Sequence, residues 1–251
     1  MEIIIIGTGN VAYHLTKALI QNKIPVKQIF GRNEKALEMF SQEFQIPSSH
    51  ERLESAALYI IAVSDASVEE VSRYITQEDC LVAHTSGSLP KEVLQGNYRK
   101  ASFYPLQTFS KTKDLDYSQI PFFIETESET DFNLLEKLGR SISEKVMAAN
   151  YEKRKYIHLT AVFSCNFVNH LFSIAKEISD SQQIPFDFFL PLIDETVEKI
   201  HHLHPKEAQT GPAVRNDKRV LSLHEVLLAD SEYLELYQML NASIQKMYRL
   251  E

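Results

Sequence analysis

The chain opens with an unbroken apolar run and then alternates between short apolar runs and segments of helical period. Residues 3–6 are four consecutive isoleucines. An unbroken run of β-branched residues is typical of a strand that is covered on both faces, as in a parallel sheet. Further strand-like runs lie at residues 26–30, 58–65, 82–88, 101–110, 122–128 and 145–149, and helical segments separate most of them. This alternation predicts an α/β domain over residues 1–149 with a doubly wound, mostly parallel sheet.

The pattern changes at residue 150, after which helical spacing continues to the end of the chain. We therefore predict an all-α domain over residues 150–251. Its first helix extends from residue 151 to about residue 179 without Gly or Pro. Such a helix would carry a polar stripe on one side. The stripe could form a polar site that faces other protein, or its side chains could be hydrogen bonded by neighbouring helices or a dimer partner. The stripe consists of Lys155, His158, Val162, Cys165, Asn166 and Asn169.

The first apolar run leads into a turn that contains two glycines, at residues 7–12. In the strand–turn–helix unit that binds dinucleotides, the first glycine permits a tight turn and the second lets the backbone approach the pyrophosphate. Residues 11–22 have helical spacing, so the N-terminus of a helix would offer its free N–H groups to the anion. We predict that the dinucleotide is bound by Gly7, Thr8, Gly9, Asn10 and Val11.

The second strand-like run ends at residues that distinguish NADP from NAD. At this place NAD sites usually carry an acidic residue for the ribose 2′-hydroxyl, whereas NADP sites carry an arginine for the 2′-phosphate. Arg32 favours NADP, and Glu34 nearby keeps NAD as the alternative. Asn33 is expected to border the same site and to cap the helix of residues 34–44. Val63 and Ser64 end the run at 58–65 and are expected to border the nicotinamide half of the cofactor.

Composition and charge narrow the possible partners. The net charge of the 251-residue chain is −8 at pH 7. A nucleic-acid backbone or an anionic membrane would require clustered Lys and Arg, so we expect neither and predict a small-molecule substrate. The two cysteines, Cys80 and Cys165, lie within apolar segments, as expected in a reducing, cytoplasmic location. The chain enters its first strand directly and no apolar run approaches about 18 residues, so we expect no signal peptide and no membrane span.

Polar side chains that follow the predicted strands mark the candidate substrate site. His84 and Ser86 end the run at 82–88, and Gln107 lies in the run at 101–110. The helix-poor segment 206–217 adds Thr210 and Arg215, and an arginine in such a loop can bind a substrate carboxylate in bidentate fashion. We predict all five residues to contact the substrate.

One helix face offers side chains that resemble metal ligands. Asp194, Glu198 and His202 recur at the spacing i, i+4 and i+8. No zinc-binding motif accompanies them, and carboxylate-rich helix faces are usually solvated, so no metal is predicted.

Six segments together carry a resemblance to a known family: GTGNVA, HTSGSLP, YPLQTFSK, HLTAVFSCNFVNHLF, LPLIDETVEKI and QTGPAVRND. They resemble a bacterial family of NADP oxidoreductases, which pair an N-terminal Rossmann domain with a C-terminal helical domain of unknown function, and the last four segments are specific to that family. The likeness spans essentially the whole chain and is greatest to Bacteroidetes members. More distantly, the layout is similar to pyrroline-5-carboxylate reductase, deazaflavin-dependent NADP reductase and the 6-phosphogluconate dehydrogenase superfamily.

The resemblance implies hydride transfer between NADP(H) and a small, anionic carbonyl, hydroxy or imine compound at the domain interface, with a homodimer formed through the helical domain. Hydroxyacid dehydrogenases of that superfamily carry a catalytic Lys, with an Asn four residues later, on the first helix of the second domain. Here Lys155 has Leu159 at that position. His158 is therefore the better candidate for proton exchange, with Asn166 and Asn169 orienting the substrate. A second hypothesis, from another class, is a non-catalytic NADP-binding sensor or regulatory protein that acts through its helical domain.

Overall fold

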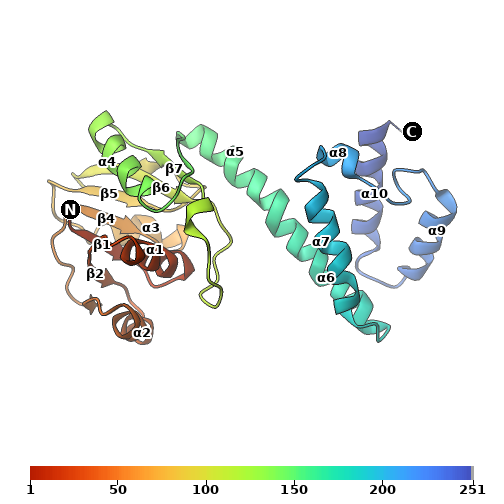
Figure 1. Ribbon diagram of the computed structural model, residues 1–251, viewed down its shortest axis with the longest axis horizontal. Helices are drawn as coiled ribbons and strands as arrows, with labels where there is room; N and C mark the ends of the chain where they lie inside the picture. Colours follow the sequence, from red (N-terminus) through yellow and green to blue (C-terminus); the bar gives the residue numbers. More distant parts are fainter. Residues whose placement is uncertain (250–251) are drawn as a thin grey trace. The chain divides into compact units, whose positions relative to one another are not determined.

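The computed structural model of the protein describes residues 1–249, and its strands form a single sheet (Figure 1). The strand order is β3-β2-β1-β4-β5-β6-β7-β8. Neighbouring strands pair in parallel, except that β6 and β7 run antiparallel. This is the doubly wound, mostly parallel Rossmann-type sheet that the sequence predicts. The strands are β1 (Ile3–Ile6), β2 (Val26–Phe30), β3 (Ser48–Ser49), β4 (Leu58–Ile61), β5 (Leu81–His84), β6 (Arg99–Pro105), β7 (Phe122–Glu125) and β8 (Val146–Ala148).

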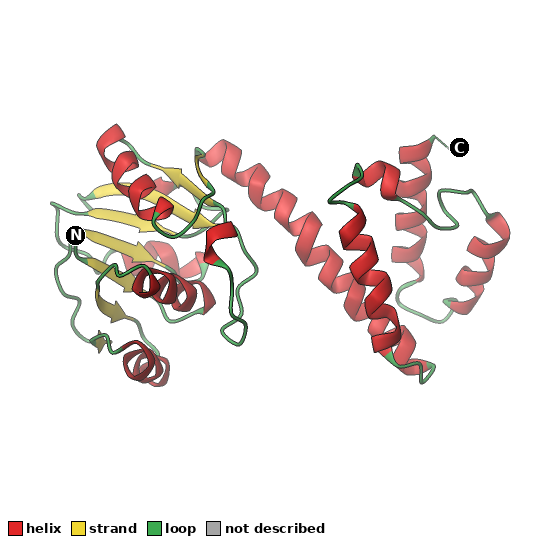
Figure 2. Ribbon diagram, in the orientation of Figure 1, coloured by secondary structure: helices red, strands yellow, loops and turns green. Residues whose placement is uncertain are grey.

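Helices separate most of the strands and make up the chain after β8 (Figure 2). The short 3-10 turns are η1 (Lys91–Val93), η2 (Tyr117–Gln119) and η4 (Phe186–Phe189). A π-helical turn, η3 (Val162–Asn166), lies between α5 and α6. The α-helices are α1 (Asn10–Gln21), α2 (Glu34–Phe44), α3 (Asp65–Ser72), α4 (Glu129–Arg140), α5 (Tyr151–Ala161), α6 (Phe167–Ser181), α7 (Leu190–Lys199), α8 (Pro205–Ala208), α9 (Lys218–Leu227) and α10 (Leu234–Tyr248).

The four isoleucines of β1 explain why the sheet is covered on both sides. Side chains alternate along a strand, so Ile3 and Ile5 enter one hydrophobic cluster while Ile4 and Ile6 enter the other. The first cluster contains residues of α1, α2 and α4, and the second contains residues of α3. Every side chain of β1 is therefore buried, which an alternating apolar and polar strand could not achieve.

The parallel strands bring distant segments to one edge of the sheet. Strands β2, β1, β4, β5 and β6 pair in parallel, so all five end at the same, carboxyl edge. In open α/β sheets this edge is where ligands bind. The segments that follow β1, β2, β4, β5 and β6 are also those that carry most of the predicted site residues of the first domain.

Contacts divide the chain into two units, Met1–Asn166 and Phe167–Glu251. The secondary structure becomes helical at Tyr151, close to the predicted boundary between residues 149 and 150. The helix α5 nevertheless belongs to the sheet unit, because Arg154 is buried against it. The domain boundary itself stays a prediction. In the part of the second unit that the structure describes, Ile174 and Ala213 are the only buried apolar residues.

The helical stretch Tyr151–Ser181 has the length and composition of a membrane span. Its most apolar 18-residue window has a mean hydropathy of 1.2, and 6% of that window is buried. Length and composition do not distinguish a span from a helix that another protein surface covers. This stretch is not an uninterrupted apolar run, because it contains the polar side chains of the predicted stripe.

Candidate functional site

The turn after β1 has the geometry that close approach to a dinucleotide requires. Gly7 has a φ of 129°, and an added Cβ there would lie 2.2 Å from the carbonyl oxygen of Ala62 on the neighbouring strand. Gly9 is the N-cap of α1, and an added Cβ there would meet nothing within 4 Å. No side chain caps the first turn of α1, so its N–H groups remain available to an anion.

The turn opens into a pocket of about 410 Å³ at the carboxyl edge of β1, β2 and β4. Asn33 caps α2, as predicted, by accepting a hydrogen bond from the Ala36 N–H at 3.1 Å. Arg32 is exposed at the rim. All the residues predicted to bind the cofactor line this pocket, so the turn has the shape that a dinucleotide requires. The contacts of these residues with a dinucleotide stay predictions. The residues are Gly7, Thr8, Gly9, Asn10, Val11, Arg32, Asn33, Val63 and Ser64.

A second hollow, which we name the Tyr104 groove, lies at the end of β6. Its volume is about 650 Å³. The Tyr104 hydroxyl and Nδ1 of His158 are 3.2 Å apart and share a hydrogen bond. Gln107 and Asn166 line the same groove, so three predicted site residues meet there. The lining residues are Tyr104, Leu106, Gln107, Thr108, Pro121, Lys153, Tyr156, Ile157, His158, Thr160, Ala161, Ser164, Cys165 and Asn166.

Tyr104 is held in this position by its neighbours. Only 9% of the residue is exposed. An added Cβ on Gly87 would lie 2.6 Å from the Tyr104 ring, so the absence of a side chain at residue 87 makes room for the ring. Burial, reinforced by the negative charge of Asp65, raises the pKa of Tyr104 to about 12. The hydroxyl therefore keeps its proton at neutral pH.

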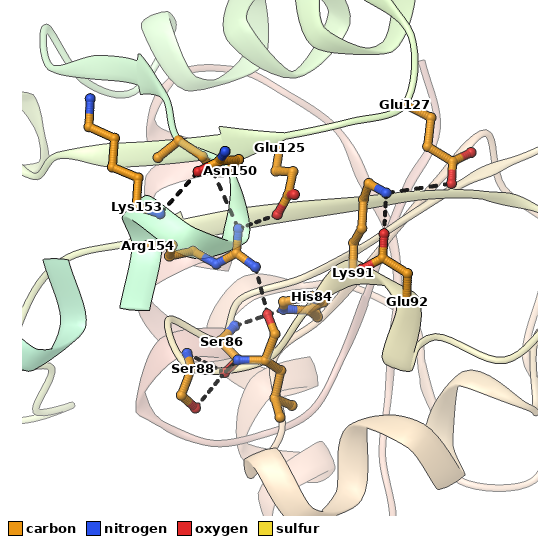
Figure 3. A network of polar contacts seen from close by, with 12 residues as sticks. His84, Ser86, Ser88, Lys91, Glu92, Glu125, Glu127, Asn150, Lys153 and Arg154 are labelled. Atoms are coloured by element: carbon orange, nitrogen blue, oxygen red, sulfur yellow. Dashed lines mark hydrogen bonds and ion pairs between the residues drawn. The ribbon is translucent and has the colours of Figure 1, made fainter. Parts of the chain in front are cut away.

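A buried polar network beneath the site fixes α5 to the sheet (Figure 3). Arg154 is fully buried, and its guanidinium lies 2.6 Å from the Glu125 carboxylate on β7. The same guanidinium donates to the Leu89 carbonyl at 2.6 Å, so α5 is tied both to β7 and to the loop after β5. His158 follows Arg154 by one helical turn on α5. This anchor positions the His158 ring beside Tyr104.

His84 and Ser86 lie within this network rather than along the Tyr104 groove (Figure 3). His84 is fully buried, and its Nδ1 accepts a hydrogen bond from the Ser86 N–H at 3.2 Å. Its Nε2 has no partner. Burial and the positive charge of Arg154 lower the pKa of His84 to about 4, so the ring is neutral at pH 7. The Ser86 hydroxyl accepts from the Ser88 and Leu89 N–H groups and stabilises the turn after β5.

The remaining predicted residues are placed differently. Lys155 pairs with Glu152 at 2.9 Å and is absent from the lining of the groove. Asn169, Thr210 and Arg215 belong to the second unit, where all three are exposed. The polar stripe laid out at 100° per residue is also interrupted, because the π turn η3 changes the angular step between His158 and Asn169. Their predicted roles stay predictions.

Sequence reasoning did not select Tyr104 and Arg154. Tyr104 lies in the predicted run at 101–110, which also contains Gln107, and this closeness to a predicted site residue is the signal that could have selected it. Arg154 precedes His158 by four residues on the predicted helix, but nothing in the sequence indicates that its side chain is buried. Tertiary structure alone supplies the Glu125 partner.

Metal-binding residues do not gather in the part of the chain that the structure describes. No group of three or more His, Cys, Asp or Glu side chains is arranged there to hold a metal ion. In the face considered above, His202 approaches Glu198 at 3.1 Å, and both side chains are exposed.

Two family models match the chain. Residues 2–86 match the family described as NADP oxidoreductase, coenzyme F420-dependent, and residues 120–244 match a domain of unknown function, DUF2520. No curated protein matches this sequence.

Solved structures extend the likeness over the whole chain. A Bacteroides fragilis protein provisionally named as an NADP oxidoreductase is 40% identical, covers 98% of both chains and has a TM-score of 0.92. An imine reductase from Myxococcus stipitatus, solved with NADP+, is 11% identical with a TM-score of 0.67, and covers 100% of this chain and 95% of its own. A 1-pyrroline-5-carboxylate reductase from Streptococcus pyogenes is 14% identical with a TM-score of 0.64, covering 99% and 98%. At these low identities the last two show the fold alone.

Proposed function

The chain belongs to the NADP oxidoreductase family in which an NADP oxidoreductase domain precedes a DUF2520 domain, and from this premise we propose that it is an NADP-dependent reductase. Its substrate would be a small carbonyl, hydroxy or imine compound bound in the Tyr104 groove. The observation that carries the proposal is the hydrogen-bonded pair of Tyr104 and His158, which lines a groove at the same sheet edge as the glycine turn.

The glycine turn and the start of α2 would hold the cofactor. The uncapped first turn of α1 would bind the pyrophosphate, and Arg32 would bind the 2′-phosphate that distinguishes NADP from NAD. When bound, NADPH supplies the hydride. The alternation of open space at Gly9 and tight packing at Gly7 supports this assignment, because the turn leaves room for a ligand only on its outer side.

His158 would exchange the proton that accompanies hydride transfer. In the reductive direction, hydride adds to the substrate carbon, a proton adds to its oxygen or nitrogen, and NADPH becomes NADP+. Because Nδ1 of His158 is hydrogen bonded to Tyr104, Nε2 is the ring nitrogen left to exchange the proton. Gln107 and Asn166 line the groove and would orient the substrate. Arg215 stays the predicted ligand of an anionic group on the substrate.

Calorimetric titration with NADPH and NADH, repeated on Arg32→Ala, tests the cofactor assignment. We expect NADPH to bind more tightly than NADH and the preference to collapse in the variant. A screen of carbonyl and imine acids, followed by NADPH absorbance, then tests reduction. His158→Gln should lower the rate about 10²- to 10⁴-fold while NADPH affinity stays within about twofold. If neither nucleotide binds, the proposal is wrong; if NADPH binds and no compound is reduced, the sensor hypothesis is favoured.

The helical unit would form a homodimer with a second copy of the chain, in the cytoplasm. A unit whose described residues bury only two apolar side chains lacks a core of its own. An apolar cavity of about 500 Å³ between α6 and α7 is lined by exposed side chains such as Ile178 and Leu192. A second copy would cover these surfaces.

Sedimentation equilibrium tests the homodimer. We expect a dimer for the unmodified protein and a monomer for Leu192→Glu, because a buried carboxylate without a partner is costly. Lys199→Glu, a charge change on the same helix, is the matched control. A monomeric unmodified protein would contradict the proposal.

A further inference from the structure

The loop between β6 and η2, residues 106–116, contains most of the segment YPLQTFSK and is fastened along α1. The Asn10 side-chain amide donates to the Phe109 carbonyl at 2.8 Å. Nε2 of His14 lies 2.9 Å from the Ser110 carbonyl oxygen. The first residues of the loop line the Tyr104 groove, whereas its middle reaches the glycine turn. A function of the groove alone would not require the second set of contacts.

Lys111 makes the contact between this loop and the glycine turn. Its ammonium donates to the carbonyl oxygen of Thr8 at 2.9 Å. The same nitrogen lies 5.1 Å from the centre of the Phe40 ring and 5.9 Å from that of Tyr13. A carbonyl dipole and two ring faces therefore hold the cation. Its side chain is half-buried, and the ammonium keeps two further N–H donors.

Among residues 1–249 Lys111 has no carboxylate partner, in contrast to Lys17 and Lys91. Lys17 pairs with Asp114, and Lys91 pairs with Glu92 and Glu127. No ion pair links Lys111 to an acidic side chain among residues 1–249. A half-buried ammonium has lost part of its hydration, so an anion bound to its two remaining N–H donors would be favourable there.

The ammonium contacts the backbone of the turn that lines the pocket, while Lys111 itself is not one of the lining residues. Thr8 is the middle residue of the glycine turn, and an added Cβ on Gly31 would lie 3.1 Å from the Thr8 methyl group. The turn therefore packs against the connection from β2 to α2. Phe40 lies on α2, and Arg32 lines the same pocket as Thr8. In dinucleotide-binding sheets, this connection contacts the 2′ position of the adenosine ribose.

We propose that Lys111 is the second cation of a 2′-phosphate site, where it acts together with Arg32. The proposal rests on the proposed function, because it presupposes that the protein binds NADP(H). A phosphate monoester carries about −1.5 to −2 charges at pH 7, so two cations balance it better than one. Arg32 comes from the connection after β2, and Lys111 comes from a loop that follows it by 79 residues in sequence. Cofactor choice is then determined by two separate segments.

Titrations of NADPH and NADH into Lys111→Met, Lys111→Arg and Lys113→Ala test this proposal. Met keeps an unbranched side chain over the Phe40 ring and removes the charge, whereas Arg keeps the charge. Lys113 is an exposed lysine of the same loop and serves as the control. We expect Lys111→Met to raise the dissociation constant of NADPH about 10- to 100-fold and that of NADH less than about threefold. Lys111→Arg should retain most of the preference, and Lys113→Ala should leave it unchanged.

Each other outcome overturns a different statement. Equal losses for NADPH and NADH in Lys111→Met would mean that Lys111 shapes the glycine turn and does not bind the 2′-phosphate. Unchanged NADPH affinity would overturn the role of Lys111 and leave the proposed function intact. If the unmodified protein binds neither nucleotide, the proposed function fails and this proposal fails with it. Thermal unfolding of each variant, measured without nucleotide, detects a general loss of structure.

Discussion

The ion pair between Arg154 and Glu125 predicts a large and asymmetric effect on stability. Arg154 has no exposed surface, and the Glu125 side chain is 14% exposed. Removing one member of a buried pair leaves an unpaired charge, at a cost of about 3–5 kcal/mol. We therefore expect Glu125→Leu to lower the free energy of unfolding by about that amount. The double variant Arg154→Met/Glu125→Leu buries no charge, and it should lose only about 1–3 kcal/mol for the carbonyl groups of Leu89 and Ala149 that lose their donor.

Urea unfolding followed by tyrosine fluorescence measures these free energies, since the chain has 11 tyrosines and no tryptophan. The midpoint that shifts should be that of the unfolding transition of the sheet unit, because this unit contains both residues. Glu127→Leu is the matched control, because Glu127 is 54% exposed and lies 3.7 Å from Lys91. Lys91 keeps Glu92 as a second partner when Glu127 is removed, and an ion pair with a solvent-exposed carboxylate contributes about 0–1 kcal/mol. A large cost of an unpaired buried charge is excluded if Glu125→Leu costs no more than Glu127→Leu, or if the double variant costs as much as Arg154→Met and Glu125→Leu together.

Two further predictions concern the glycine turn and His84. Gly7→Ala should destabilise the fold by at least about 2 kcal/mol, because the added Cβ would overlap the Ala62 carbonyl. Gly9→Ala should change the stability in thermal unfolding by no more than about 0.5 kcal/mol, because its Cβ would meet nothing within 4 Å, and should instead weaken NADPH binding at least about tenfold. Equal stability of the two variants would contradict this. Burial and Arg154 lower the pKa of His84 from 6.5 to about 4, so the unfolded chain binds more protons between these values. The contribution of His84 to stability is therefore complete above pH 6.5 and falls by about 3 kcal/mol as the pH drops to 4. In urea unfolding at a series of pH values, His84→Gln should flatten this dependence. An equally steep dependence in the variant would contradict the prediction.

Local sequence signals predicted the elements of the sheet and the residues that surround the pocket at the glycine turn. Apolar runs, turn glycines and helix caps are local signals, because each reports the conformation of a few neighbouring residues. The isoleucines of β1, the glycines of the turn and the Asn33 cap all lie where these signals predict. The predicted residues from Gly7 to Ser64 that line the pocket at the glycine turn follow β1, β2 and β4 directly, so the position of each strand end placed them.

The Tyr104 groove depends on contacts between segments far apart in the chain. Tyr104 and His158 are 54 residues apart in sequence, and Lys111 reaches Thr8 across 103 residues. The π turn also changed the relation between His158 and Asn169, which an ideal helix cannot predict. Periodicity gives the face on which a side chain lies, but the partner on that face is chosen by packing of the whole sheet unit. The burial of Arg154, the hydrogen bond between Tyr104 and His158, and the contact of Lys111 with the glycine turn are therefore seen only in the tertiary structure.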